Sequence, residues 1–135
     1  MENDDDDDIE LPLPPVPPEP PIKNLSVDEL AELTRQYDYH RGKIVFELIH
    51  RARADDPAAA KALRDLSEHP ALRNDRIFHM VSLAWAAIIG LLGTEKPYTR
   101  QLAYDAFAKL EPKDQENLLF YLKCEKIEDA HPPAI

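Results

Sequence analysis

The chain has 135 residues and a formal net charge of −10, and it contains one cysteine and three glycines. The single cysteine, Cys124, excludes an intrachain disulfide and any site that needs several cysteines, such as a zinc finger. The scarcity of glycine disfavours a β-sandwich or barrel, whereas abundant alanine, leucine and charged residues favour helices.

The N-terminal segment is acidic and rich in proline. Residues 1–25 carry eight acidic side chains and one lysine, whereas residues 26–135 carry 18 acidic and 15 basic side chains. The aspartates of Asp4–Asp8 repel one another and have nothing to bury, and the prolines that follow favour polyproline II. We therefore expect residues 1–24 to form a disordered, charged tail and spacer.

The proline tract also contains Pro18-x-x-Pro21-x-Lys23, a form that SH3-type grooves accept. Overlapping PxxP matches occur in any such tract, so a spacer is the simpler interpretation. An alternative role for the aspartate run is contact with a basic surface on a partner.

The first helix is expected to follow Leu25. Ser26 and Glu29 form a capping box, with Leu25 and Leu30 placed as the hydrophobic staple. Apolar residues then recur at helical spacing on both sides of Gly42. Glycine inside a helix is unfavourable by about 1 kcal/mol relative to alanine, so a break or kink at Gly42 is slightly favoured over one long helix.

The next helix has a clear beginning. Asp56 and Pro57 supply an N-cap and a proline at the first helical position. The helix should continue to about Leu66, and the His69-Pro70 step should end it.

The most apolar stretch of the chain is Ile77–Leu92. Its 16 residues fall short of the roughly 20 that a transmembrane helix needs, so we expect a buried helix. Asn74 or Asp75 is the candidate N-cap, and Gly93 is the candidate residue after the helix. A helix that is apolar on every side must be covered by other helices or by a second copy of the chain.

Two further helices complete the predicted domain. Leu102, Ala103, Ala106, Phe107 and Leu110 line the first, and Pro112 opens the second, whose apolar residues are Leu118, Leu119, Tyr121 and Leu122. We expect an all-α fold, a compact bundle of five to six helices around the central apolar helix at about 77–92. This domain spans 25–128, and residues 129–135 form a short C-terminal tail.

The candidate partner-binding residues lie just before Gly42. Tyr37, Tyr39, His40 and Arg41 form a dense aromatic and polar cluster, and tyrosine and arginine are frequent in interface hot spots. The alternative is that Tyr37 packs in the core while the other three lie exposed at a helix end.

Two histidines have spacings that metal sites use. Glu47-x-x-His50 has the spacing of di-iron bundles, which however need a second such motif and further carboxylates. His79 follows Asp75 by four residues, but no other ligands cluster nearby. We expect no metal and no cofactor, with Glu47 and His50 as a solvated pair.

No catalytic arrangement is recognisable. Ser26, Ser67 and Ser82 do not occur in the elbow that positions a nucleophile, and phosphate-binding glycine loops are absent. Glu125, next to Cys124, disfavours the thiolate. We therefore expect a protein that is not an enzyme.

The leading hypothesis is a protein–protein interaction module, such as a small adaptor, inhibitor or regulatory subunit, whose acidic tail adds electrostatic contacts. We expect it to be cytoplasmic, to have a protein partner and no membrane contact, and to form a homo-oligomer through the apolar helix if part of that helix is left uncovered.

Two alternatives remain open. A helical DNA-binding transcriptional regulator is suggested by nine bases between Arg35 and Arg76, although seven acids share that stretch. A metal-binding helical bundle is the other alternative.

Overall fold

The residues that favour helices in the sequence form helices in the computed structural model, which describes residues 18–36, 39–75 and 81–132. The elements of these ranges are all helical, so the predicted all-α class is confirmed. In chain order they are η1 (Ile22–Asn24), α2 (Val27–Gln36), α3 (Arg41–Arg53), α4 (Pro57–Leu66), α5 (Pro70–Asn74), α6 (Leu83–Leu92), α7 (Pro97–Ala108), α8 (Pro112–Leu122) and η2 (Ile127–Asp129).

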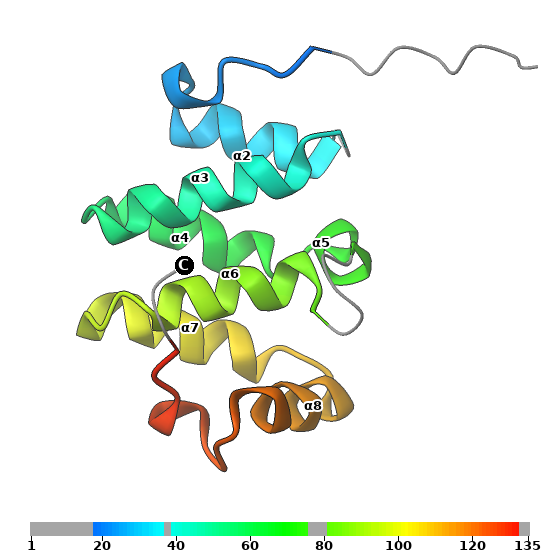
Figure 1. The fold of residues 1–135 in the computed structure, drawn as a ribbon, viewed down its shortest axis with the longest axis vertical. Coiled ribbons are helices and arrows are strands. Elements are labelled where there is room, and N and C mark those ends of the chain that lie inside the picture. The colour runs from blue at the N-terminus through cyan, green and yellow to red at the C-terminus, as the bar shows by residue number, and fades with distance from the viewer. Residues whose placement is uncertain (1–17, 37–38, 76–80, 133–135) are drawn as a thin grey trace, which may run out of the picture.

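The helices follow one another along the long axis of the molecule (Figure 1). η1 and α2 lie at one end, α8 and η2 lie at the other, and the remaining helices lie between them. α6 contacts α3, α4, α5 and α7, and all of its residues except Ile89 are buried. This helix therefore offers little surface for the predicted pairing with a second copy of the chain.

α2 begins at the predicted capping box. The Ser26 hydroxyl accepts a hydrogen bond from the Glu29 N–H at 3.1 Å, and the Glu29 carboxylate accepts one from the Ser26 N–H at 2.8 Å. The following break precedes Gly42: His40, with a left-handed φ of 62°, comes directly before α3. Gly42 lies in the first turn of α3 without a positive φ, so glycine is not what separates the two helices.

α4 begins as predicted and is followed by a helix that was not expected. The Asp56 carboxylate accepts hydrogen bonds from the N–H groups of Ala58 and Ala59 at 3.0 and 3.4 Å. His69 does not merely follow the end of α4, since its Nδ1 accepts from the Ala71 N–H at 3.1 Å and caps α5. Histidine is not among the preferred N-cap residues, which is why the sequence did not reveal α5.

The apolar helix begins later than predicted. The Ser82 hydroxyl accepts from the Trp85 N–H at 3.1 Å, and α6 starts at Leu83. Asp75 is extended after α5, and its carbonyl oxygen accepts from the Leu83 N–H at 2.8 Å. Residues 77–80 of the predicted helix lie outside the described ranges. A serine inside an apolar run fits both a helix interior and a cap, so periodicity alone could not decide.

α6 ends at Leu92 and Gly93 follows it, as predicted. Gly93 follows the helix with φ −72° and ψ −11°, a right-handed conformation that any residue can adopt. The left-handed conformation that glycine often adopts after a helix is therefore not used here.

The body extends further toward the N-terminus than residue 25. Ile22 is buried, and Arg51 of α3 donates hydrogen bonds to three carbonyl oxygens of this segment, those of Leu25, Ile22 and Lys23 at 2.7, 3.1 and 3.3 Å. Lys43 pairs with Glu19 at 2.7 Å. Residues 18–24 thus lie along α3 as a docked arm and do not belong to a free tail. Residues 1–17 of the predicted tail lie outside the described ranges.

An arginine side chain also holds the C-terminal segment against the body. Arg100 of α7 donates to three carbonyl oxygens, those of Leu92, Ala130 and Glu128 at 2.9, 2.9 and 3.1 Å. The side chains of His131 and Glu95 are 3.0 Å apart, and this hydrogen bond lowers the pKa of Glu95. Residues 129–132 therefore pack on α7 and are not a frayed tail, while residues 133–135 lie outside the described ranges.

Candidate docking surface on the last helix

Gln115 connects the start of α8 to the end of α7 through side-chain hydrogen bonds. Its side-chain amide donates to three carbonyl oxygens of the preceding helix end and turn, those of Phe107, Leu110 and Ala108 at 3.1, 3.2 and 3.3 Å. α8 ends at Leu122, and the next residue, Lys123, has a left-handed φ of 60°. The helix is thus held in a fixed orientation from its first turn.

Five consecutive apolar residues, 118–122, close α8. Because successive residues are about 100° apart around a helix, such a run surrounds it, and no single packing face can bury all five. Leu118 is fully buried and its neighbour Leu119 partly so, whereas Phe120 is 80% exposed and Tyr121 is 45% exposed. Phe120 is the most exposed large hydrophobic residue in the described ranges.

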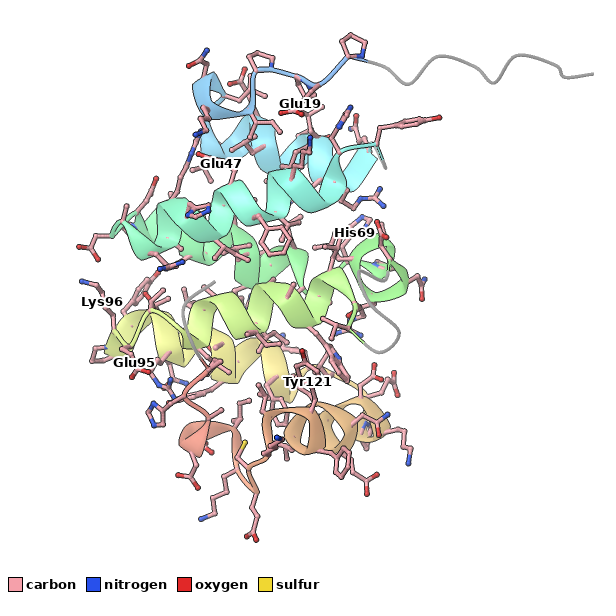
Figure 2. The ribbon with its side chains drawn as sticks, viewed as in Figure 1. Glu19, Glu47, His69, Glu95, Lys96 and Tyr121 are labelled. Carbon is pink, nitrogen blue, oxygen red and sulfur yellow. The ribbon has the colours of Figure 1, made fainter. Side chains whose placement is uncertain are left out.

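Tyr121 connects this exposed surface to the core. Its ring lies 6.1 Å from that of Trp85 in α6, with an angle of 49° between the planes. Figure 2 shows Tyr121 between α8 and the helices next to it. A tilted aromatic pair at this distance is favourable, so Tyr121 helps to hold α8 while Phe120 points to solvent.

The predicted partner-binding cluster is divided by the fold. Tyr37 lies outside the described ranges, Tyr39 is 45% exposed and His40 is half-buried. Arg41 is buried: its Nε donates to the Thr34 carbonyl oxygen at 2.8 Å, and its Nη1 pairs with Asp75 at 3.2 Å. Arg41 therefore links α2 to the end of α5, and its guanidinium is not a surface group. Partner binding by Tyr39 and His40 stays a prediction.

The candidate metal ligands are not brought together. Glu47 is half-buried and pairs with Arg51 at 3.0 Å, while His50 is exposed. Glu47 and His50 are thus not the solvated pair that the sequence predicted, and His79 lies outside the described ranges. Among the residues that the structure describes, no three or more His, Cys, Asp or Glu side chains are grouped closely enough to hold a metal ion.

Cys124 lies just beyond α8 and is half-buried. Burial, followed by the charge of Asp129, raises the pKa of its thiol. The sequence suggested Glu125 as the neighbour that disfavours the thiolate, whereas the fold places Asp129 in this role.

The basic residues between α2 and α5 are largely engaged within the chain. Arg41, Arg51 and Arg73 donate to backbone carbonyl oxygens. Carboxylates pair with four others, Arg35, Lys43, Lys61 and Arg64. Arg41, Arg51 and Arg73 are therefore used within the fold, whereas the Lys43 and Lys61 side chains stay exposed beside their carboxylates. DNA binding stays a prediction.

A shallow cavity of about 370 Å³ lies between the docked arm and α3, and Figure 2 shows Glu19 and Glu47 on this side of the molecule. The arm itself departs from polyproline II here, because Ile22–Asn24 form a 3-10 turn with Ile22 buried. The SH3-type motif Pro18-x-x-Pro21-x-Lys23 is therefore not extended along its whole length.

No helix in the described ranges has the length and apolar character required to cross a bilayer. The chain matches no family model, no curated protein and no solved structure with which it was compared.

Phe120 was not singled out by the sequence pattern. Helical spacing assigned the apolar residues around it to the core, because spacing marks which residues share a face but not which face is covered. The available signal was the unbroken apolar run 118–122, which is too wide for one packing face.

Proposed function

We propose that this protein is a non-enzymatic protein–protein interaction module, a small adaptor, inhibitor or regulatory subunit, and that α8 presents its docking surface. The observation that carries this proposal is the 80% exposure of Phe120 beside the half-exposed Tyr121. Burying a phenylalanine side chain contributes about 1.5–3 kcal/mol, and this contribution is available to a partner.

The way α8 is held also supports docking. Gln115 and Tyr121 restrain the helix before any partner arrives, so little conformational entropy is lost when Phe120 becomes buried. An exposed aromatic residue on a fixed helix suits the mode in which a helix lies in a groove of its partner. In this proposal the run Asp4–Asp8 adds electrostatic steering.

The direct test is site-specific photo-cross-linking in cells of the source organism. A photoreactive benzoylphenylalanine is placed at position 120 of the full chain, and the products are identified by mass spectrometry. The expected result is one dominant cross-linked protein. The control has the same replacement at Tyr98, an aromatic residue in the first turn of α7 that is 54% exposed.

The proposal requires that the product depend on position 120. The same partner yield from positions 98 and 120, or no product from either, would overturn it. Replacement of Asp4–Asp8 by asparagine is expected to slow association without changing the cross-linked partner, because a distant charge run acts mainly on the encounter rate.

A further inference from the structure

We propose that the partner of the α8 surface is a protein with an apolar pocket bordered by lysine and arginine side chains. This inference rests on the proposed function and adds the chemistry of the partner. It follows from how charge is distributed in the folded body.

The net negative charge of the body lies entirely at the end that carries α8. Residues 26–110 contain 12 acidic and 12 basic side chains, so their charges balance. Residues 111–132 contain six acidic side chains and three lysines, a net charge of −3. Since Figure 1 places α8 and η2 together at one end, these charges and the exposed aromatic residues belong to the same end of the molecule.

Most of the acids near α8 have no partner within the described residues. Lys113 and Glu116 pair with each other at 3.5 Å and largely cancel. Between residues that the structure describes, no ion pair is formed by the acidic side chains of Glu111, Asp114, Glu125, Glu128 and Asp129 or by Lys123 and Lys126. Unpaired carboxylates at the end of the molecule that carries an exposed apolar residue favour a partner with positive charge beside its apolar pocket.

The same distribution argues against a second copy of this chain on the α8 surface. Two copies that met through Phe120 would bring two net charges of −3 together. Like charges at an interface are unfavourable, so self-association through Phe120 is opposed by electrostatics. Nucleic acid and anionic lipid are repelled for the same reason.

The test uses three synthetic peptides with the same positional pattern. Two are amphipathic, leucine with lysine and leucine with glutamate, and the third, serine with lysine, lacks an apolar face. Each is titrated into the isotopically labelled full chain, and amide shifts locate the contact. The titrations are repeated on the full chain with Asp4–Asp8 replaced by asparagine, so that binding to the tail is separated from binding to α8.

The leucine–lysine peptide is expected to shift the amides of residues 111–131 and to bind about tenfold more tightly than either other peptide. Phe120→Ala is expected to weaken it by about tenfold or more, whereas Tyr98→Ala leaves its affinity unchanged. Raising the salt concentration should weaken it further, because the rim charges are exposed.

Equal binding of the leucine–lysine and leucine–glutamate peptides at α8 would overturn the basic partner while leaving the docking surface intact. Shifts confined to other faces, no binding at all, or binding indifferent to Phe120→Ala would also overturn this inference. Concentration-dependent broadening of α8 amides without peptide would assign the surface to a second copy instead. The cross-linking experiment tests the proposed docking function separately, because its outcome does not depend on the charge of the partner.

Discussion

Gly90 of α6 lies so close to Ile49 of α3 that a β-carbon on the glycine would be 2.8 Å from the Cγ1 and Cδ1 atoms of the isoleucine. Real β-carbons do not approach other atoms this closely, so a side chain at position 90 would require Ile49 to shift. Both residues are buried, and side chains in a close-packed interior have little room to shift.

Gly90→Ala is therefore expected to destabilise the protein by about 1–3 kcal/mol, measured by chemical denaturation. Gly42→Ala is the matched control, because no atom lies within 4 Å of the place that its β-carbon would take and its φ is not positive. This control should be neutral or stabilising by up to about 1 kcal/mol. In a double-mutant cycle, Ile49→Ala should remove most of the Gly90→Ala effect, and strict additivity would contradict the proposed contact.

Arg51→Lys is expected to loosen the docked arm. Lysine keeps the charge but cannot reach the carbonyl oxygens of Ile22, Lys23 and Leu25 with a planar fork. Loss of these hydrogen bonds should lower the local opening free energy by about 1–2 kcal/mol, and trypsin should then cleave after Lys23 about tenfold faster.

The control for the arm is Arg35→Lys, which alters an exposed pair with Glu32. Such pairs contribute little, so cleavage after Lys23 should match that of the unaltered chain. If both variants were cleaved at the same rate, Arg51 would not be what holds the arm.

Leu118 and Phe120 are two residues apart, but their truncations should have different consequences for stability. Leu118→Ala removes a fully buried side chain and should cost about 2–5 kcal/mol. Phe120→Ala should change the free energy of unfolding by no more than about 0.5 kcal/mol, because the ring is largely in water already. Urea denaturation measures both, and a large loss for Phe120→Ala would make this residue structural.

The environment of Glu29 makes the stability of the protein depend on pH in the acid range. The backbone N–H of Ser26, followed by the Ser26 hydroxyl, holds the pKa of Glu29 below its ordinary value of 4.5. A lowered native pKa means that the carboxylate stabilises the fold above pH 4.5, and that this contribution is lost as the pH falls through the native pKa. NMR titration of the Glu29 carboxyl group should give a midpoint below 4.5.

Glu29→Gln should flatten the acid limb of the stability curve, since glutamine still accepts from the Ser26 N–H but does not titrate. Ser26→Ala should raise the Glu29 midpoint only part of the way, because the backbone N–H remains. A Glu29 midpoint at 4.5 or above would show that the capping box does not form in solution.

The limits of the sequence pattern are clearest at α6. The apolar composition of 77–92 indicated a buried helix, and α6 is buried, but the pattern placed its start at Ile77 and not at Leu83. Ser82 begins the helix because its hydroxyl meets the Trp85 N–H, and this choice competes with a serine in a helix interior. The separation of α2 from α3 is similar, since glycine chemistry favoured Gly42 while the left-handed residue is His40.

Three features could be predicted without any knowledge of the fold: the all-α class, the capping box at Ser26 and Glu29, and the start of α4 at Asp56 and Pro57. Each of these depends on hydrogen bonds or propensities that act within about four residues along the chain.

Two other features depend on the folded chain. Hydrogen bonds hold the two end segments of the described chain against the helices, and Phe120 is exposed while Leu118 is buried. Arg51 and Arg100 reach carbonyl oxygens up to 29 and 30 residues away. Which residues of α8 are exposed depends likewise on which distant helices pack against it. The spacing of apolar residues along the helix does not predict this.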